Sequence, residues 1–334
     1  MTPVTSRTKL FLLGLIACGC VLANLIIGPS IAPMDSLAAL LGVGPQATDA
    51  GVRQVLQELR LPRALAAFGV GSSLALSGVL LQALFRNALA DPYVLGVSGG
   101  AAAGALATWV GFGAGAGLLA VQGGAAMGAM VSVTVLLLLT HRTDRSGASN
   151  NVLLTGIMIA SLSGALVILL MAIAPDSQLR SMVFWLSGDL AWAQTPWLSL
   201  SLAVAALCGA LLLARPLNVL AAGDLRARSV GLDSIVWQRG VIVTSALLTS
   251  GAVVTAGSIG FVGLIAPHTA RVLLRSSDHR WVAPASALLG GALVSAADII
   301  ARSAIAPQQL PVGAVIALVG APCFLWLLRR KYTA

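Results

Sequence analysis

The residues of this chain that could move charge or protons through an apolar environment are few. Asp298 is the one carboxylate that lies clearly inside an apolar run, and Arg302 follows it four residues later. That spacing places both side chains on one helical face, where an ion pair near the end of the helix accounts for them. Ionisable groups inside membrane helices also serve as proton relays. One aspartate with a partner gives a proton-driven carrier little support, so the pattern favours the ion pair.

A nucleophilic serine is the second chemical possibility. Gly96-Val97-Ser98-Gly99 matches the G-x-S-G pattern of intramembrane serine proteases, and His268 could act as its general base. The pattern is short and glycine-rich in a chain with 36 glycines, so chance explains it. Small residues of this kind also let helices approach closely. We therefore expect a structural role for Ser98, a hydrogen-bonded structural role for His268, and no catalytic residue.

Motifs for nucleotide and metal binding are missing from the sequence. A phosphate-binding loop ends in Lys followed by Ser or Thr, whereas the two lysines, Lys9 and Lys331, precede Leu and Tyr. The four cysteines lie in apolar runs without ligand spacing, and no second His or Cys stands at ligand spacing from His268. We expect the cysteines to be small core residues. No cofactor and no metal site are predicted, and the chain is not expected to be an enzyme.

The elements that must position these residues are membrane-spanning helices. Of 334 residues, 58% are hydrophobic and 9% are charged, against about 25% charged in an average soluble domain. Apolar runs of about 20 residues recur, which is the length of a helix that crosses a lipid bilayer. The net charge of +9 could suggest nucleic acid, but the arginines lie between apolar runs and no basic patch alternates with aromatic residues. The sequence predicts an all-α integral membrane protein with no nucleic-acid partner.

The apolar runs predict about ten transmembrane helices in one domain that covers residues 1–334. The first run follows Arg7 and Lys9 and resembles a signal peptide, but the polytopic sequence behind it favours an uncleaved helix. A glycine-rich stretch at 252–261 could contain a broken helix. The expected spans are 9–28, 61–84, 94–111, 118–140, 150–174, 193–214, 235–256, 261–275, 282–301 and 311–328.

The distribution of Lys and Arg predicts the topology. With a cytoplasmic N-terminus, fifteen of these residues fall in inside segments, and five fall outside: Arg53, Arg60, Arg63, Arg180 and Arg302. This positive-inside bias and an even number of spans place both termini in the cytoplasm. Two connections are longer than topology requires, and long ordered loops usually carry function. We expect a short surface helix in the outer loop 29–59 and a helix-turn-helix in the inner segment 215–239.

Short sequence motifs follow one another in a specific order along nearly the whole chain. The first half contains Leu61-Pro62-Arg63, Ser77-Gly78 with Gln82, Arg86-Asn87-Ala88-Leu89-Ala90-Asp91-Pro92, Leu95-Gly96-Val97-Ser98 and Gly100-Ala101. The second half contains Trp185-Leu186-Ser187-Gly188, Arg215-Pro216-Leu217-Asn218, the run from Gly257 to His268, Asp298-Ile299-Ile300-Ala301-Arg302, Leu310-Pro311-Val312-Gly313 and Gly320-Ala321-Pro322. In these motifs the chain resembles the FecCD-like permease subunits of the ABC importers for iron-siderophore, heme and cobalamin. One departure is Ala88, where this family usually has Pro.

The resemblance implies a homodimeric permease in the bacterial inner membrane. Each subunit is expected to pair with a second copy around one translocation path, with two cytoplasmic ATP-binding subunits and a periplasmic substrate-binding protein. Its cargo would be a large metal chelate, moved from periplasm to cytoplasm by alternating access. We expect an iron source, heme or a ferric siderophore, with cobalamin as the alternative, because no residue here decides between them. A gradient-driven carrier and an intramembrane protease are remote alternatives.

The resemblance also assigns functional residues. Docking of the binding protein is expected at Arg60, Arg63 and Arg302, which would pair with carboxylates on its two lobes; headgroup contact or pairing with Glu58 and Asp298 is the alternative. Coupling to the ATPases is expected from the loop at about 216–232, through Leu217, Gly223, Asp224, Arg226, Arg228 and Gly231. The cytoplasmic gate is expected at Asn87, Leu89, Ala148 and Ser149.

Overall fold

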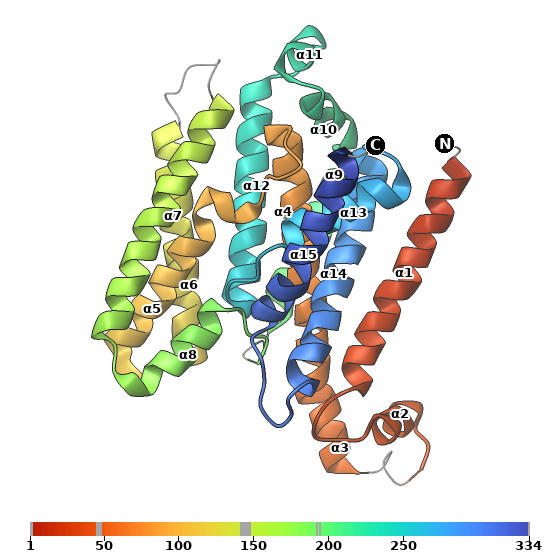
Figure 1. Cartoon of the computed structure of the whole chain (residues 1–334), viewed down its shortest axis with the longest axis vertical. Coiled ribbons are helices and arrows are strands. Elements are labelled where there is room, and N and C mark those ends of the chain that lie inside the picture. The colour runs from red at the N-terminus through yellow and green to blue at the C-terminus, as the bar shows by residue number, and fades with distance from the viewer. Residues whose placement is uncertain (1–2, 45–48, 141–147, 192, 194, 333–334) are drawn as a thin grey trace.

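The computed structural model describes residues 3–44, 49–140, 148–191, 193 and 195–332. Within these ranges, the side chains of 3–5, 114, 148–150, 224, 228 and 324–332 are not described. The long elements of the described chain are helices that run roughly along one direction (Figure 1). They are α1 (Pro3–Ile26), α4 (Leu61–Phe85), α5 (Val97–Phe112), α6 (Leu118–Thr140), α7 (Ala148–Ile173), α9 (Trp197–Leu212), α12 (Ser234–Ala256), α13 (Val262–Leu274), α14 (His279–Ser303) and α15 (Val312–Tyr332).

These helices confirm the predicted spans. In the described part of the chain, six helices are long and apolar enough to cross a membrane, and α9 with α10 forms a bent pair that passes the same test. Three shorter apolar helices, α5, α13 and the described part of α15, complete the set. Each predicted span overlaps one of these helices. In lipid a helix satisfies its own backbone hydrogen bonds, which is why apolar runs become helices here.

Short helices occupy the two ends of the bundle (Figure 1). At the end that carries both chain termini, here called the termini end, lie α10 (Ala214–Ala221) and α11 (Asp224–Ser229). At the opposite end lie α2 (Pro33–Leu41), α3 (Ala50–Gln54), the π-helical turn η2 (Val55–Arg60) and α8 (Asp176–Leu186). The short 3₁₀ turns are η3 (Pro92–Leu95) and η4 (Gly113–Gly115). The predicted surface helix and helix-turn-helix are thus both present, whereas α8 was not predicted.

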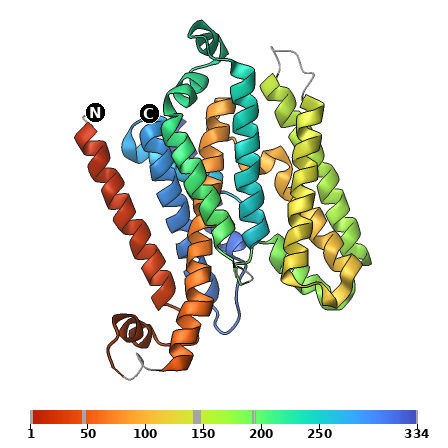
Figure 2. The ribbon, with the colours of Figure 1, turned by 180° about the vertical axis from the view of Figure 1, so that it is seen from behind.

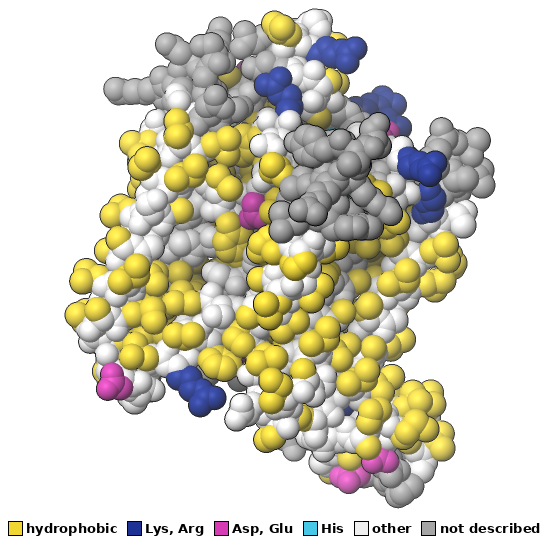
Figure 3. Space-filling view, in the orientation of Figure 1, with side chains coloured by type: hydrophobic (Ala, Val, Ile, Leu, Met, Phe, Trp, Pro, Cys, Tyr) yellow, Lys and Arg dark blue, Asp and Glu magenta, His cyan; other side chains and the backbone are white. Residues whose placement is uncertain are grey.

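The types of side chain on the surface also differ between the middle and the ends of the molecule. In the face shown in Figure 3, hydrophobic side chains cover the middle of the molecule, and most of the visible Lys and Arg side chains lie at the termini end. This distribution is the one expected for a protein whose middle is surrounded by hydrocarbon and whose basic end is cytoplasmic.

Helix α4 forms the centre of the bundle, where 89% of its most apolar stretch is buried. Its glycines allow backbones to touch: a Cβ on Gly71 would lie 2.1 Å from the carbonyl oxygen of Gly290 in α14, and one on Gly78 would lie 2.0 Å from that of Gly263 in α13. Small residues at such crossings are the usual way in which membrane helices gain packing contact. The core therefore depends on the absence of side chains at these positions.

Gly71→Ala is expected to lower the thermal unfolding midpoint of the purified protein in detergent. The methyl group has no room against Gly290, and forced overpacking costs about 1–3 kcal/mol. Gly123→Ala in α6 is the matched control, because nothing lies within 4 Å of its new Cβ, and Ala favours helix over Gly by about 1 kcal/mol. Equal midpoints for the two variants would contradict the close α4–α14 contact.

The predicted break at 252–261 is present between α12 and α13. Helix α12 ends at Ala256, and α13 begins at Val262 after a non-helical stretch. Gly257 has φ of 66°, and a Cβ there would lie 2.0 Å from the carbonyl oxygen of Trp185. The Asp189 N–H donates to the carbonyl of Ala256 over 2.8 Å, which satisfies one carbonyl at the end of α12. Irregular backbone is tolerated here because other protein segments cover it.

Candidate functional site

A buried charge cluster lies near the opposite end of the bundle, where α1, α4 and α14 meet. Asp298 of α14 is fully buried and accepts hydrogen bonds from Arg63 of α4, at 2.8 Å from Nη2 and 3.0 Å from Nε. Arg302 lies one turn further along α14, with its Nε 3.6 Å from Asp298 Oδ2. The predicted pairing of Asp298 and Arg302 is therefore present, and Arg63 is a second and closer partner.

Asn24 connects α1 to the same cluster. Its Nδ2 donates to the carbonyl of Ser295 over 3.0 Å and to Asp298 Oδ2 over 3.1 Å. Arg302 Nη2 in turn donates to Asn24 Oδ1 over 3.0 Å and to the Asn24 carbonyl. One carboxylate thus holds three helices together, because bonds from ionised groups are stronger than neutral ones.

Arg60 is buried a short distance away and has a different set of partners. Its Nη1 donates to the carbonyls of Leu25 and Ile26 over 3.0 and 2.8 Å and to the Ser36 hydroxyl over 2.9 Å. These carbonyls end α1 and would otherwise lack partners. A cation at a helix C-terminus also complements the helix dipole. Arg60 therefore fastens α2 and the start of α4 to the end of α1.

The structure places the three predicted docking arginines inside the subunit. Arg60 and Arg302 are each 4% exposed, whereas the side chain of Arg63 is 13% exposed. Arg63 Nη1 reaches towards the surface and donates to Gln309 over 3.3 Å. Of the alternative pairing with Glu58 and Asp298, the pairs of Asp298 with Arg63 and Arg302 are present. Arg60 bonds to the end of α1 and to Ser36 instead, and Glu58 accepts from Gln54. A protein that docks at this end reaches Arg63 before the other two.

The predicted coupling segment projects from the termini end. Helix α9 stops at Leu212 and α10 leaves it at 76°, and α11 lies past the ends of the long helices (Figure 1). Leu217 is buried and anchors α10, Gly223 has φ of 111° and Gly231 has φ of 78°, which are turn conformations that favour glycine. Arg226 is exposed. The side chains of Asp224 and Arg228 lie outside the described residues.

Two apolar side chains that sequence reasoning missed stand out in this segment. Leu225 is 88% exposed and Val230 is 65% exposed. They lie beyond the spanning helices, where lipid does not account for exposed apolar surface.

Asn218 of α10 links the coupling segment to the start of α14. Its Nδ2 donates to Asp278 Oδ1 over 2.8 Å, and its Oδ1 accepts from the His279 backbone N–H over 3.0 Å and lies 2.6 Å from His279 Nδ1. Burial alone would raise the pKa of Asp278, but the bonds from Asn218 and from the Arg280 N–H outweigh it and lower that pKa. The carboxylate stays charged and caps α14.

The predicted gate loop lies between α4 and η3 at the same end. Asn87 and Leu89 are both exposed, and Asn87 Oδ1 accepts from the Leu89 N–H over 2.9 Å. Arg86 of this loop lies against the coupling segment, since a Cβ on Gly223 would be 3.2 Å from its Nη1. Helix α7 begins at Ala148, and the side chains of Ala148 and Ser149, the other predicted gate residues, lie outside the described residues.

Ser98 and the cysteines are the other residues that were considered for chemistry. Ser98 is 5% exposed in the first turn of α5, next to Gly99, where a Cβ would meet Ser163 of α7. Among the described residues, no three His, Cys, Asp or Glu side chains are grouped as metal ligands. The core placement expected for the cysteines was wrong. Cys18, Cys208 and Cys323 are exposed and Cys20 is half-buried, because these faces of α1, α9 and α15 form the outer surface.

Together, the long apolar helices of the described chain, the breaks between them and the projecting end segment define a polytopic membrane protein. Comparison with known proteins identifies the family to which this membrane protein belongs. A sequence profile of the FecCD transport family matches residues 14–330, so the chain belongs to this family and is a permease subunit of an ABC importer.

Individual relatives agree with this assignment. The chain is similar to the vitamin B12 import system permease protein BtuC of Klebsiella pneumoniae subsp. pneumoniae, at 39% identity over 82% of each chain. It is also similar to BtuC of Escherichia coli O127:H6, at 38% identity over 82% of this chain and 83% of that protein. Both of these relatives are named as vitamin B12 import permeases.

Two solved structures share the fold. One, described as an inward-facing metal-chelate type ABC transporter, has a TM-score of 0.84 at 30% identity and is covered over 99% of its length, with 97% of this chain. PsaBC from Streptococcus pneumoniae in complex with Fab has a TM-score of 0.52 at 16% identity, with 82% of this chain and 92% of that chain covered, and shows the fold alone.

Proposed function

We propose that this subunit imports cobalamin from the periplasm into the cytoplasm by alternating access in the bacterial inner membrane. The proposal of cobalamin as the cargo is based on the similarity to BtuC permeases over 82% of the chain. Heme and ferric siderophores, the cargo first expected, are the competing substrates. The translocation path is proposed to lie between this subunit and a second copy.

We propose that two ATP-binding subunits dock on the termini end and supply the energy. This orientation places both termini in the cytoplasm, as the Lys and Arg distribution predicts. Leu225 and Val230 offer apolar contacts there, and Arg226 offers a charge. Small helices that dock on a moving partner can transmit its closure as a rigid-body motion. Asp224, Arg228 and Gly231 belong to the same proposed docking segment.

The coupling segment has two contacts through which it can act on the rest of the subunit. Arg86 links Gly223 to the loop that holds Asn87 and Leu89, so a shift of α10 and α11 reaches the proposed gate directly. Asn218 links α10 to α14. The remaining gate residues, Ala148 and Ser149, stay proposals from the family resemblance.

We propose that the periplasmic binding protein docks at the opposite end, above the Asp298 cluster. The cluster has two guanidinium groups and one carboxylate, so it carries a net positive charge. A carboxylate of the binding protein can reach Arg63, the most exposed of the three arginines. Arg60 and Arg302 would then act by holding this surface in place.

The test is ATP-dependent uptake into proteoliposomes that contain the subunit and its cognate ATPase. The binding protein is loaded in turn with radiolabelled cobalamin, heme and ferric siderophore. Accumulation of cobalamin alone is the expected result. Uptake of heme or siderophore instead would reject the proposed cargo while keeping the importer, and uptake without the ATPase would reject the energy source.

A further inference from the structure

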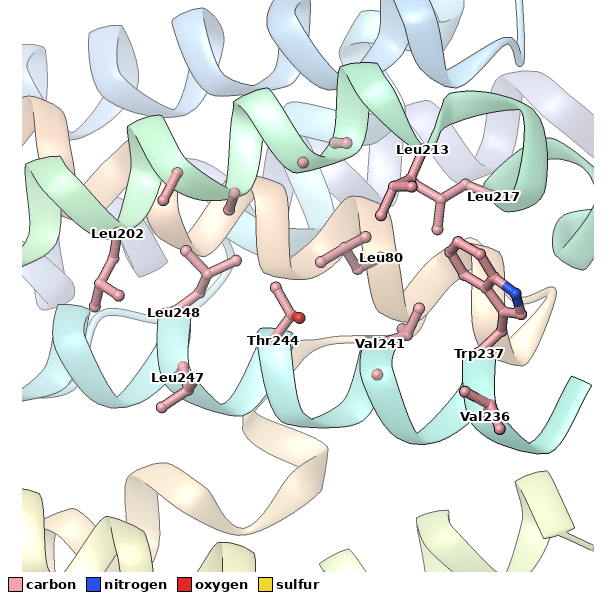
Figure 4. A pocket seen from close by; sticks show the side chains of 15 residues that line it. Leu80, Leu202, Leu213, Leu217, Val236, Trp237, Val241, Thr244, Leu247 and Leu248 are labelled. Atoms are coloured by element: carbon pink, nitrogen blue, oxygen red, sulfur yellow. The ribbon is translucent and has the colours of Figure 1, made fainter. Parts of the chain in front are cut away.

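An apolar groove of about 480 Å³ runs between α9 and α12, with Leu80 of α4 at its floor (Figure 4). The side chains that line it are almost all hydrocarbon, and Thr244 carries the one hydroxyl among the described lining residues. Leu217 of the coupling segment lines one end of this groove, but most of the lining residues come from α9 and α12 and have no part in the proposed transport path. In Figure 2, α9 and α12 lie side by side on the face turned to the viewer. Leu213, Gly240 and Leu247 of the groove lining are exposed, so the groove opens to the outside of the bundle.

The groove is closed at one end and open at the other. Towards the opposite end of the bundle, Leu202 of α9 packs on Gly251 of α12, where a Cβ would lie 2.4 Å from Leu202 Cδ1. Towards the termini end, Leu213 and Trp237 line the open mouth. From Leu202 to Leu213 the helix rises about 16 Å at 1.5 Å per residue, which is about half of a hydrocarbon core about 30 Å thick. The groove therefore has the depth of one leaflet.

Two glycines give the groove its width. Gly209 of α9 and Gly240 of α12 both line it, and a Cβ on either would have nothing within 4 Å. Leu213 and Leu247 at its rim are 45% and 55% exposed. In a protein surrounded by lipid, such an open apolar groove has hydrocarbon chains as its neighbours.

We propose that the groove binds one acyl chain of an anionic phospholipid from the leaflet at the termini end. Trp237 stands at the mouth with its indole nitrogen turned away from the groove and towards the termini end (Figure 4). Tryptophan prefers this headgroup level, where its ring contacts hydrocarbon and its N–H finds a polar partner.

The charges around the mouth favour an anionic headgroup. Arg215 lies between the lining residues Leu213 and Leu217, Arg239 lies between Trp237 and Gly240, and both arginines are exposed. The nearby Asp233 carboxylate already accepts hydrogen bonds from the N–H groups of Ile235 and Val236. Basic side chains at the membrane surface attract anionic lipids.

Native mass spectrometry of the purified protein tests the proposal independently of transport. The protein is reconstituted in nanodiscs of phosphatidylglycerol and phosphatidylethanolamine and then stripped with detergent. We expect one phosphatidylglycerol per subunit to remain on the wild type, and its occupancy to fall at least about tenfold, or about 1.4 kcal/mol, in Gly209→Leu/Gly240→Leu. A Cβ at either position meets nothing within 4 Å, so the leucine side chains have room to enter the groove.

The matched control is Gly19→Leu/Gly123→Leu, on α1 and α6, where added Cβ atoms also have open space. This control should keep the lipid. Arg215→Gln/Arg239→Gln should keep one lipid but lose the preference for phosphatidylglycerol over phosphatidylethanolamine. Retention of the lipid by the groove-filled variant, no retained lipid on the wild type, or an unchanged headgroup preference in the arginine variant would each overturn the proposal.

Discussion

Asp298→Ala is expected to be the most destabilising single substitution in the charge cluster. It leaves Arg63 and Arg302 without their carboxylate, and Arg302 is 4% exposed. Breaking a buried pair by removing one partner costs about 3–5 kcal/mol, because the remaining charge is buried without compensation. The thermal unfolding midpoint of the purified protein in detergent should therefore fall sharply, and the yield of folded protein should fall with it.

Three comparisons make this result specific. Asp176→Ala removes an exposed carboxylate at the start of α8 and should change stability by about 0.5 kcal/mol or less. Arg63→Gln should cost less than Asp298→Ala, since Asp298 keeps Asn24 and Arg302 as partners. Asp298→Asn keeps the shape of the side chain but not its charge, so its loss of stability should lie between those of Arg63→Gln and Asp298→Ala. An Asp298→Ala variant as stable as Asp176→Ala would show that the cluster does not hold α1, α4 and α14 together.

The spanning helices could be predicted closely because lipid leaves the chain few alternatives. An apolar run of about 20 residues must form a helix to satisfy its backbone in hydrocarbon, so length and composition alone locate it. Helix α8 was missed for the same reason. It mixes Asp176, Ser177, Gln178 and Arg180 with apolar residues outside the spans, so it lacks the signal that identified the others.

The partners of Arg60 and Arg63 could not be predicted from local sequence, whereas the i, i+4 spacing did predict the Asp298–Arg302 pair. Arg60 and Glu58 are close in the chain, which suggested a local pair, but the partners of Arg60 come from the end of α1 and from α2. Arg63 meets Asp298 across 235 residues of sequence. Buried charge pairs between distant segments depend on helix packing, and composition does not reveal that packing.

The coupling segment was also predicted only in part. The loop length and the family resemblance located α10 and α11, Gly223 between them and Gly231 after α11. The contact that joins them to α14 was not foreseen, because Asn218 and Asp278 are 60 residues apart. Asn218 lies within one of the motifs that carry the family resemblance, but its bond to Asp278 follows only from the fold.

Asn218→Ala is expected to uncouple transport from ATP hydrolysis. The substitution removes the side-chain bonds that join α10 to Asp278 and His279, while the apolar anchors Leu217 and Leu220 remain. Coupling free energies of about 1–3 kcal/mol correspond to factors of about 5–150. In proteoliposomes with the proposed ATPase and loaded binding protein, cargo moved per ATP hydrolysed should fall by such a factor, while ATP hydrolysis continues.

Leu225→Asp provides the contrast that separates coupling from docking. Leu225 is exposed on α11 and has no role in the Asn218 contact. Its substitution should therefore weaken association with the ATPase, measured by co-purification. The amount of cargo moved per ATP hydrolysed should stay the same in the complexes that do assemble. Asn218→Ala should do the reverse. If Asn218→Ala instead lowers association and leaves the cargo moved per ATP hydrolysed unchanged, α10 serves only as a docking surface, and motion of the coupling segment must reach the proposed gate through the Gly223–Arg86 contact.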